Sequence, residues 1–528
     1  MKKLPIGIQT FSKIIEDNCY YVDKTRIVSE LAASGGYFFL SRPRRFGKSL
    51  FLDTLKEAFS GNRDLFKGLY LEKNWNWELK YPVIKISFGN GAHSLEGLHS
   101  SFEYNLRVSA EDHSVSLEGL HYDEKFKDLI RKISIKYNEK VVILIDEYDK
   151  PILDNLTYPE TAVRIREELR SFYSVIKDSD AFVRFVFITG VSKFSKINLF
   201  SGLNNLQDIT LDRNFSSICG YTQSELLNVF QDGLADVNMD ELKLWYNGYN
   251  FLGEKVYNPF DILLYLKNKE FKNYWFETGN PSFLIELIHK NNYNSIDIEN
   301  VEISEESLGS FDVDMIELET LLFQTGYLTI DKKYNIGAKI RYRLKYPNME
   351  VRMSLTEVIL KFLTDSRKTV KIESELYRIL EKNDLDAMQP LFHSFFASIP
   401  HDWYRKNTMA NYEGYYASIF YCYFTSLGLD VRTEDVTNQG QVDMTVFFED
   451  RVYVFEFKVI ELAGPGSALA QIKTKRYYEK YLSAFTGTQG DIAGTHGRAS
   501  LRRENIYLIG VEFSRDSRNI EVCEWEKL

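Results

Sequence analysis

The sequence is poor in the residues that mark several classes of protein. Only 4 of its 528 residues are cysteine, namely Cys19, Cys219, Cys422 and Cys523. Their scattered positions form no CxxC pair, so neither a zinc site nor a disulfide framework is indicated. No apolar run approaches the length of a membrane span, and no apolar stretch typical of a signal peptide follows Lys2 and Lys3. We therefore expect a soluble, reduced, cytoplasmic protein with no membrane partner.

Positive charge is also scarce. Lysine and arginine number 65 against 75 aspartates and glutamates, giving a net charge of −10 and a pI near 5.5. This acidic balance argues against a protein that coats nucleic acid or a membrane surface. Any nucleic-acid contact must therefore come from a local basic patch. The chain is 44% hydrophobic, and its length suggests about three domains at roughly 150 residues each.

Apolar runs alternate with helical patterns in the first third of the chain. The runs cover residues 37–41, 81–88, 141–146 and 183–190. Continuous apolar strands between helices predict a parallel sheet that is covered on both faces. The fold class is therefore α/β.

The remaining sequence predicts two further regions. The pattern from about 222 to 365 is mostly helical and closes with a helix and a small β-hairpin, which is consistent with a winged-helix unit. From 411 the pattern is helix, strand pair, helix and strand, and the Gly-, Ser- and Thr-rich stretch 487–500 is predicted to be a mobile loop. The predicted domains cover residues 1–222, 223–365 and 366–528. The second is the helical and winged-helix-like region, and the third begins with a helical linker.

The segment RPRRFGKS (42–49) lies between a predicted strand and a predicted helix. Gly47, Lys48 and Ser49 match the end of the phosphate loop GxxxxGK[ST]. Backbone N–H groups of such a loop hold phosphates, the lysine adds positive charge, and the serine hydroxyl ligates Mg²⁺. Arg42 replaces the first glycine of the pattern, so the match is degenerate. Taken alone, it is equally consistent with an ordinary loop.

A second element strengthens the nucleotide hypothesis. The apolar strand in VVILIDEYDKP (141–151) ends in Asp146, which is expected to hold the metal through water, and Glu147, which is expected to polarise the attacking water. The alternative is a strand that ends in a solvated acidic turn. Thr189, with Ser192 close behind, ends the next strand and either senses the γ-phosphate or caps the strand end.

The expected cofactors of this site are ATP and Mg²⁺. Arg44 and Arg45 either assist phosphate binding or face solvent, and Arg213 is one candidate arginine finger among several. The predicted nucleotide-binding residues are Arg44, Arg45, Phe46, Gly47, Lys48, Ser49, Asp146 and Thr189, with Ser49 and Asp146 at the metal and Glu147 as the catalytic residue.

A second set of charged residues lies near the C-terminus. A hairpin turning at residues 449–450 would place Asp443 beside Glu456, and strand alternation puts Glu456 and Lys458 on one face. Two carboxylates can hold Mg²⁺ or Mn²⁺ for phosphodiester cleavage, and a lysine can position the attacking water. Glu413 is a further candidate carboxylate.

The D…ExK pattern is loose, and by itself it also describes a salt-bridged strand. Context favours a site, because a buried Glu and Lys in the apolar strand are costly unless they are paired or metal-bound. Gln471 and Lys473, on the following helix, are expected to contact the substrate backbone.

Five motifs together resemble a known family. They are YYVDKT (20–25), RPRRFGKS, ILIDEYDKP, FITGVSKFS and WYNGYNF (245–251). In this order they resemble the AAA-ATPase-like proteins of gut and anaerobic bacteria, which are usually fused to a C-terminal PD-(D/E)XK nuclease domain. The segments that contain Asp443, Glu456 and Gln471 resemble that nuclease domain. The resemblance implies that Arg42 belongs to the family's own pattern.

Three functions are compatible with these features. The leading hypothesis is an ATP-dependent or ATP-regulated nuclease that acts on nucleic acid, with DNA preferred. The first alternative is a signalling or scaffold ATPase whose nuclease-like domain only binds DNA. The second is a nucleotide-binding module without turnover, in which Arg42 distorts the loop. A homo-oligomer is compatible with each of them.

Overall fold

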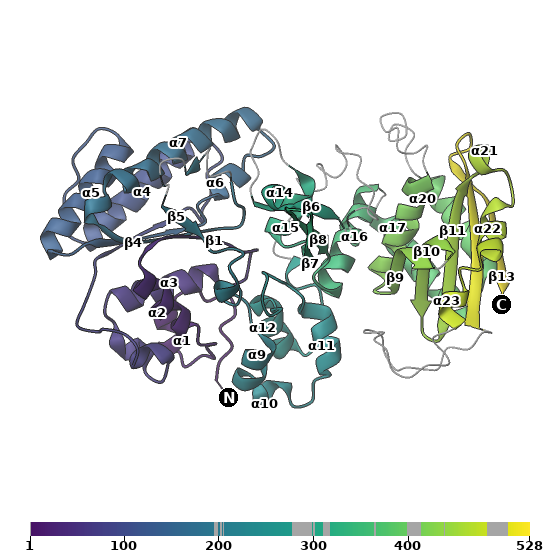
Figure 1. Cartoon of the computed structure of the whole chain (residues 1–528), viewed down its shortest axis with the longest axis horizontal. Helices are drawn as coiled ribbons and strands as arrows, with labels where there is room; N and C mark the ends of the chain where they lie inside the picture. The colour runs from purple at the N-terminus through teal and green to yellow at the C-terminus, as the bar shows by residue number, and fades with distance from the viewer. Residues whose placement is uncertain are drawn as a thin grey trace. The chain divides into compact units, whose positions relative to one another are not determined.

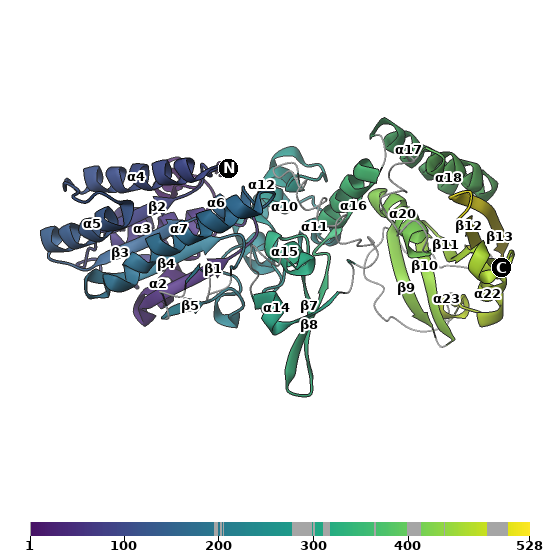
Figure 2. The same ribbon diagram turned by 90° about the horizontal axis from the view of Figure 1, so that it is seen from above.

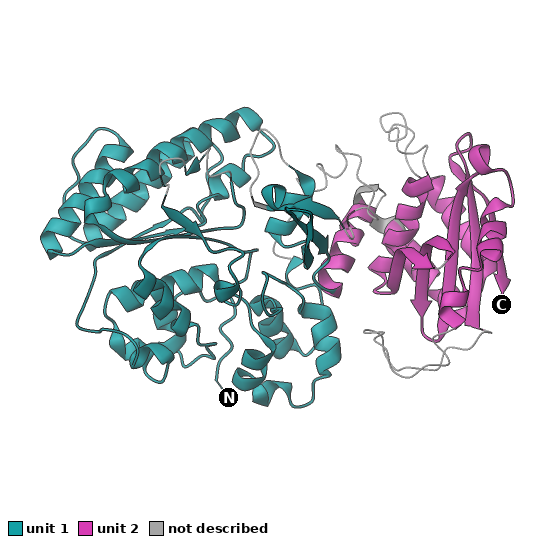
Figure 3. Cartoon of the chain, viewed as in Figure 1, with its two compact units in different colours: residues 1–283, 301–348 teal, residues 284–300, 349–528 magenta. Residues whose placement is uncertain are grey.

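The computed structural model (Figure 1; Figure 2) describes residues 2–194, 199–200, 203, 205–276, 298, 301–309, 317–363, 366–398, 413–437, 439–482 and 505–528. They form two compact units, which we call unit 1 (residues 1–283 and 301–348) and unit 2 (residues 284–300 and 349–528) (Figure 3). No helix among these residues is long and apolar enough to cross a membrane.

The mostly helical region 223–365 is shared between the two units. The three domain boundaries drawn from the sequence stay a prediction. The predicted loop 487–500 lies outside the described residues.

Unit 1 is built on a parallel sheet, as the apolar runs predict. Four of its five strands were predicted, and the short strand at residues 206–208 was not. Its strands are β1 (Gly36–Ser41), β2 (Val83–Ser87), β3 (Val141–Asp146), β4 (Val183–Gly190) and β5 (Leu206–Asp208). Their order is β2-β3-β4-β1-β5, and every pairing is parallel. Strand β4 therefore separates the strand before the phosphate loop from the strand that ends in Asp146. The carboxyl ends of all three meet at one edge of the sheet.

Helices cover both faces of this sheet, so its central strands are buried. Figure 1 shows one group of helices below the sheet and a second group above it. The lower group is α1 (Phe11–Glu16), α2 (Thr25–Ser34) and α3 (Lys48–Phe59); the upper group is α4 (Leu95–Asp112), α5 (Tyr122–Tyr137), α6 (Lys150–Leu153) and α7 (Pro159–Asp178). All six residues of β3 are buried, which is why that strand is a continuous apolar run.

The rest of unit 1 is a helical group followed by a small antiparallel sheet. The helices are α9 (Gln223–Val229), α10 (Gln231–Leu234), α11 (Met239–Tyr246) and α12 (Pro259–Asn268). The later elements are β6 (Glu302–Ser304), α14 (Glu305–Gly309), α15 (Leu318–Thr325), β7 (Thr329–Ile336) and β8 (Lys339–Lys345). The strand order is β6-β8-β7. The helix and hairpin predicted at the end of this region are therefore α15, β7 and β8.

Unit 2 contains a mixed five-stranded sheet with order β13-β12-β11-β10-β9, in which only β11 and β12 are parallel. Its strands are β9 (Asp430–Thr437), β10 (Gly440–Phe448), β11 (Arg451–Val459), β12 (Ile506–Ser514) and β13 (Asn519–Lys527). Its helices are α16 (Met349–Leu363), α17 (Ser366–Lys382), α18 (Met388–Phe396), α20 (Glu413–Ser426), α21 (Ile460–Ala463), α22 (Ser467–Lys475) and α23 (Glu479–Leu482). Strands β10, β11 and β12 were predicted, whereas the edge strands β9 and β13 were not.

Candidate functional site

The predicted phosphate loop joins β1 to α3. Gly47 has φ of 94° and immediately precedes the first residue of α3, a left-handed conformation that glycine adopts without strain. No side chain caps this helix, so the N–H groups of its first turn stay available to an anion. The loop lines a cavity of about 390 Å³.

The lysine of the loop is held in place by loop carbonyls. Lys48 is buried, and its Nζ donates hydrogen bonds to the carbonyl oxygens of Arg42 and Pro43, both at 2.9 Å. Burial lowers the pKa of Lys48, and the nearby carboxylate of Asp146 opposes that shift. Lys48 and Ser49 both line the cavity. An ammonium, a hydroxyl and helix N–H groups are the donor set that a nucleoside triphosphate with Mg²⁺ requires, so the residues present fit that group.

The carboxylate that ends β3 is fixed by the neighbouring strand. Thr189, at the end of β4, is fully buried, and its Oγ1 donates a 2.6 Å hydrogen bond to Oδ1 of Asp146. Thr189 does not line the cavity. The sequence suggested a contact between Thr189 and the γ-phosphate or a capped strand end. The structure instead gives this hydroxyl to Asp146.

Two other carboxylates, those of Glu147 and Asp149, line the cavity, whereas Asp146 does not. Glu147 has φ of 53°, a rare left-handed conformation for a residue other than glycine, directly after β3. Burial raises the pKa of Glu147, and Asp146 raises it further. Asp149 was not singled out from the sequence, although it belongs to the same DEYD segment. It is buried and accepts the backbone N–H groups of Val191 (3.0 Å) and Ser192 (2.6 Å).

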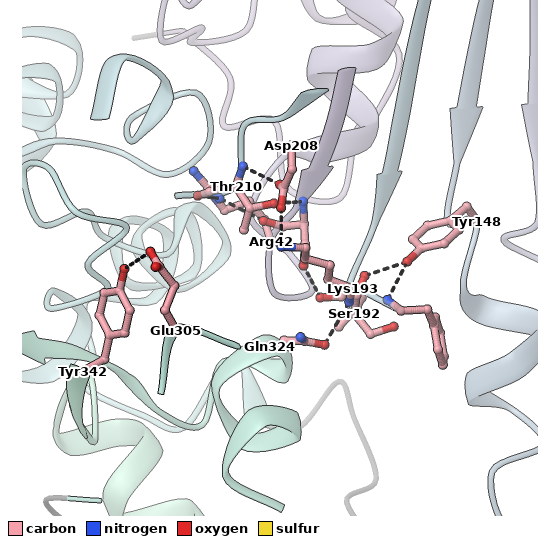
Figure 4. A network of polar contacts seen from close by, with 12 residues as sticks. Arg42, Tyr148, Ser192, Lys193, Asp208, Thr210, Glu305, Gln324 and Tyr342 are labelled. Carbon is pink, nitrogen blue, oxygen red and sulfur yellow. Dashed lines mark hydrogen bonds and ion pairs between the residues drawn. The ribbon is translucent and has the colours of Figure 1, made fainter. Parts of the chain in front are cut away.

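The arginine that replaces the first loop glycine has a structural role. Arg42 is fully buried and donates to the carbonyl oxygens of Ser41 and Thr210 at 2.8 Å and of Phe215 at 3.2 Å. Figure 4 shows it beside Thr210. Its Cζ lies 3.8 Å from the ring centroid of Phe251, in the WYNGYNF motif. The guanidinium therefore ties the loop to the chain after β5, and it does not line the cavity of Lys48.

The glycine of the WYNGYNF motif, Gly248, allows its backbone to approach the backbone of Pro347 closely. Gly248 has φ of 124°, and a Cβ built on it would lie 1.8 Å from the carbonyl oxygen of Pro347. A side chain there would force these two segments apart. The motif thus holds Phe251 where it covers Arg42.

Of the other predicted loop residues, two arginines line the cavity and one aromatic residue packs in the interior. Arg44 and Arg45 line the cavity, and Cζ of Arg45 lies 4.8 Å from the ring centroid of Phe260. Phe46 is buried, and its ring packs edge-on against Tyr249 with centroids 4.7 Å apart. The arginine-finger candidate, Arg213, is exposed and does not line the cavity. It follows β5 in the chain.

The residues that form one wall of the cavity were not predicted from the sequence. It is formed by the N-terminal segment and by the start of α12, through Pro5, Gly7, Ile8, Gln9, Pro259, Phe260 and Leu263. No motif links two segments that lie so far apart in the chain. The wall is largely apolar and faces the phosphate loop across the cavity.

In unit 2, the carboxylates of Asp443 and Glu456 come together as predicted. The β10–β11 ladder pairs Met444 with Phe455, and the hairpin turns at residues 449–450. The next residues outward are Asp443 and Glu456. The ladder ends here, and Asp443 Oδ2 accepts the backbone N–H of Phe457 at 2.7 Å.

Lys458 lies between the acidic side chains. Its Nζ is 3.1 Å from Oε1 of Glu456, 3.1 Å from Oε1 of Glu413 and 3.0 Å from the carbonyl oxygen of Phe457. Burial works to lower the pKa of Lys458, but the surrounding carboxylates outweigh it and raise the pKa. Glu413 therefore joins the site from the start of α20.

The carboxyl groups of Asp443 and Glu456 both have raised pKa values. Burial raises the pKa of Asp443 to about 6, and burial together with the nearby carboxylate of Asp443 raises the pKa of Glu456 to about 7. Oε2 of Glu456 is buried and has no hydrogen-bond partner. An unpartnered carboxylate oxygen beside a second carboxylate fits a hard divalent cation such as Mg²⁺ or Mn²⁺. Within the described residues, no three acidic, His or Cys side chains converge as a complete ligand set.

The two candidate residues on α22 differ in position. Gln471 donates from Nε2 to Oε1 of Glu456, so it belongs to the site by orienting that carboxylate. Lys473 does not join these residues, and its contact with the substrate backbone stays a prediction. Lys473 pairs with Glu526 of β13 at 2.5 Å, because residues two apart on a helix point to different sides.

The two units thus define a P-loop ATPase-like domain and a nuclease-like domain on one chain. Residues 5–200 match the family model described as predicted AAA-ATPase, and residues 411–489 match the PD-(D/E)XK nuclease superfamily. The chain is 50% identical over 525 residues to the "Uncharacterized protein in vnfD 5'region" of Azotobacter chroococcum mcd 1, which covers 98% of each chain. The chain belongs to this family of AAA-ATPase-like proteins with a C-terminal PD-(D/E)XK domain.

Proposed function

We propose that the chain binds and hydrolyses ATP in unit 1 and cleaves nucleic acid, DNA by preference, in unit 2. The observation that carries the nuclease assignment is the buried, unpartnered Oε2 of Glu456 beside Asp443 and Lys458. Burying a carboxylate oxygen without a partner costs free energy, so it indicates a function rather than a structural ion pair.

The ATPase half of the proposal assigns a role to each residue at the carboxyl end of the sheet. The first turn of α3 and Lys48 bind the phosphates, and Ser49 and Asp146 hold Mg²⁺, which neutralises charge on the phosphates when it is bound. Glu147 lines the same cavity and orients the attacking water. Thr189 keeps the Asp146 carboxylate in one orientation. The ammonium of Lys48 has three N–H donors and gives two to the Arg42 and Pro43 carbonyls, so one remains for a phosphate.

The nuclease half uses the three residues that converge at the end of the β10–β11 hairpin. Asp443 and Glu456 would hold Mg²⁺ or Mn²⁺, which activates water and stabilises the charge of the pentavalent phosphorus when it is bound. Gln471 fixes Oε1 of Glu456, so that Oε2 is the free ligand oxygen. Lys458 positions the water or takes its proton, and Glu413 holds the ammonium in place.

The test measures both activities on the same preparations of the full chain. Phosphate release and cleavage of plasmid, linear and single-stranded DNA are followed with Mg²⁺, Mn²⁺ or EDTA. Asp443→Asn should abolish cleavage and keep ATP hydrolysis in the absence of DNA, while Lys48→Ala should abolish hydrolysis. Asp384→Asn, an exposed change elsewhere in unit 2, is the matched control.

Two results would overturn parts of the proposal. If the wild-type protein hydrolyses ATP but cuts no substrate with either metal, the nuclease assignment fails. The alternative, a DNA-binding scaffold, then takes its place. An Asp443→Asn variant that cleaves like wild type would place the activity elsewhere.

A further inference from the structure

The β7–β8 hairpin is basic in an acidic protein. Residues 331–345 contain six lysines or arginines and one acidic residue, whereas the whole chain has a net charge of −10. Figure 2 shows the hairpin projecting away from the elements around it in unit 1. Its outer part is exposed, from Lys332 to Lys339 with the partial exception of Tyr334. This hairpin is the kind of local basic patch that nucleic-acid contact by an acidic protein requires.

The strand register gathers the charge on one face. Cross-strand pairs share a face, and the faces alternate along each strand. Lys332 pairs with Arg343, Tyr334 with Arg341, and Ile336 with Lys339, and these three pairs are two residues apart. One face of the ribbon therefore carries four cations with an aromatic and an aliphatic side chain between them. The opposite face carries the buried Tyr342.

The outer cations of this face are not neutralised. At the base of the hairpin, Asp331 pairs with Arg343 at 2.6 Å and with Lys345 at 2.7 Å. Farther out, Lys332, Lys339 and Arg341 form no ion pair among the described residues, and the carboxylate of Glu302, the partner of Arg343 on β6, interacts with the hydroxyl of Tyr334. The tip residue Ile336 is a large apolar side chain that is 58% exposed. Three unpaired cations and an exposed apolar tip indicate a partner with acceptor oxygens and a groove.

We propose that this face of the β7–β8 hairpin binds the sugar-phosphate backbone of duplex nucleic acid. The inference rests on the proposed nuclease function and names the surface by which unit 1 holds the substrate. A two-stranded ribbon is narrow enough to enter a major groove. Lysine and arginine side chains spaced along it match repeating phosphates, and such contacts hold DNA without reading its sequence.

The experiment is a binding titration with a fluorescein-labelled duplex DNA, in EDTA and without ATP, at several salt concentrations. The variant Lys332→Ala/Lys339→Ala/Arg341→Ala is compared with Lys127→Ala/Lys140→Ala/Lys267→Ala, which removes the same charge from exposed positions elsewhere in unit 1. The slope of log K against log salt concentration is negative, and each lost phosphate contact reduces its magnitude by about 0.9. We expect this slope to be smaller in magnitude by about 2 to 3 in the hairpin variant than in wild type, for every DNA sequence tested. The control variant should have the slope of wild type.

A charge-preserving variant, Lys332→Arg/Lys339→Arg, should bind like wild type. Thermal unfolding of each variant shows that a loss of binding is not a loss of fold. Equal salt slopes for the hairpin variant and wild type would overturn the inference while leaving the nuclease proposal standing. So would a hairpin variant that binds DNA normally but loses binding to phosphatidylserine vesicles. Wild-type protein that neither binds nor cuts any nucleic acid would overturn the proposed function itself.

Discussion

Thr189 Oγ1 donates a 2.6 Å hydrogen bond to Oδ1 of Asp146, and this contact joins the carboxyl ends of β4 and β3. Both residues are buried. A carboxylate can turn about its χ2 torsion, and a buried donor on one oxygen fixes that torsion. The other oxygen is then presented in one direction. We infer that Thr189 acts on the nucleotide site through Asp146 as a positioning residue.

Thr189→Val should weaken ATP hydrolysis and also destabilise unit 1. Valine keeps the shape but leaves Oδ1 of Asp146 buried without a donor, which costs about 1–3 kcal/mol of unfolding free energy. Thermal unfolding and phosphate release at several Mg²⁺ concentrations measure the two effects. Thr157→Val, at an exposed position, is the control. An unchanged Mg²⁺ dependence of hydrolysis would contradict the positioning role.

Lys48→Ala should lower ATP affinity at least about tenfold, because a hydrogen bond to a charged group is worth about 1.5–3 kcal/mol. Lys48 is buried. Its removal loses two hydrogen bonds and relieves the burial of a charge, and these effects oppose each other. We therefore expect the unfolding free energy to change by about 1 kcal/mol or less. Fluorescent-nucleotide binding and chemical unfolding test both statements, and wild-type affinity would refute the site.

Glu147→Gln should bind ATP and hydrolyse it slowly. Glutamine keeps the size of the side chain and cannot accept the proton of the water, so the rate should fall by about 10²–10⁴-fold. Nucleotide binding and single-turnover hydrolysis separate the two steps. Glu160→Gln, an exposed change in α7, is the control. Undiminished turnover in Glu147→Gln would mean that another residue orients the water.

The sequence was a good guide where the pattern is local. Apolar runs predicted the strands of unit 1 because a parallel sheet buries both faces of its central strands. The pairing of Asp443 with Glu456 followed from hairpin geometry and side-chain alternation alone. The edge strand β9 was not predicted, because Arg432, Glu434 and Asp435 interrupt its apolar pattern.

Contacts between distant segments could not be predicted in this way. Two of the three carbonyl partners of Arg42 lie 168 and 173 residues further along the chain, and Phe260 reaches the cavity of the predicted phosphate loop from α12. The ion pair of Lys473 with Glu526 could not be predicted either, because Glu526 lies in a strand at the end of the chain. Such contacts depend on how the elements pack, which no short motif encodes.

The stability of unit 2 should fall as pH rises when no metal is present. The pKa values of Asp443 and Glu456 are raised to about 6 and about 7, whereas free carboxyls titrate near 4. The folded state therefore holds more protons than the unfolded state between about pH 4 and pH 7. The stabilisation is complete at the acid end of this window and lost at its upper end.

Calorimetry of the full chain in EDTA, between about pH 5 and pH 8, can test this dependence. The transition that Glu456→Gln alters is assigned to unit 2. Its midpoint should fall with pH more steeply in wild type than in Glu456→Gln, which has one fewer titrating carboxyl. Equal slopes for the two proteins would contradict the raised pKa of Glu456.

The last prediction separates the roles of Lys458 and its neighbours. Lys458→Met should slow DNA cleavage strongly and leave Mn²⁺ binding in place, because an ammonium cannot be a metal ligand. Binding should even strengthen, since the change removes a positive charge from beside the Glu456 carboxylate. Glu456→Gln should lose both cleavage and Mn²⁺ binding. Calorimetric titration of Mn²⁺ and single-turnover cleavage measure the two properties, and Lys473→Met, on the same domain but paired with Glu526, is the matched control. If Lys458→Met lost Mn²⁺ binding as fully as Glu456→Gln while remaining folded, Lys458 would be a structural partner of the carboxylates rather than a participant in cleavage.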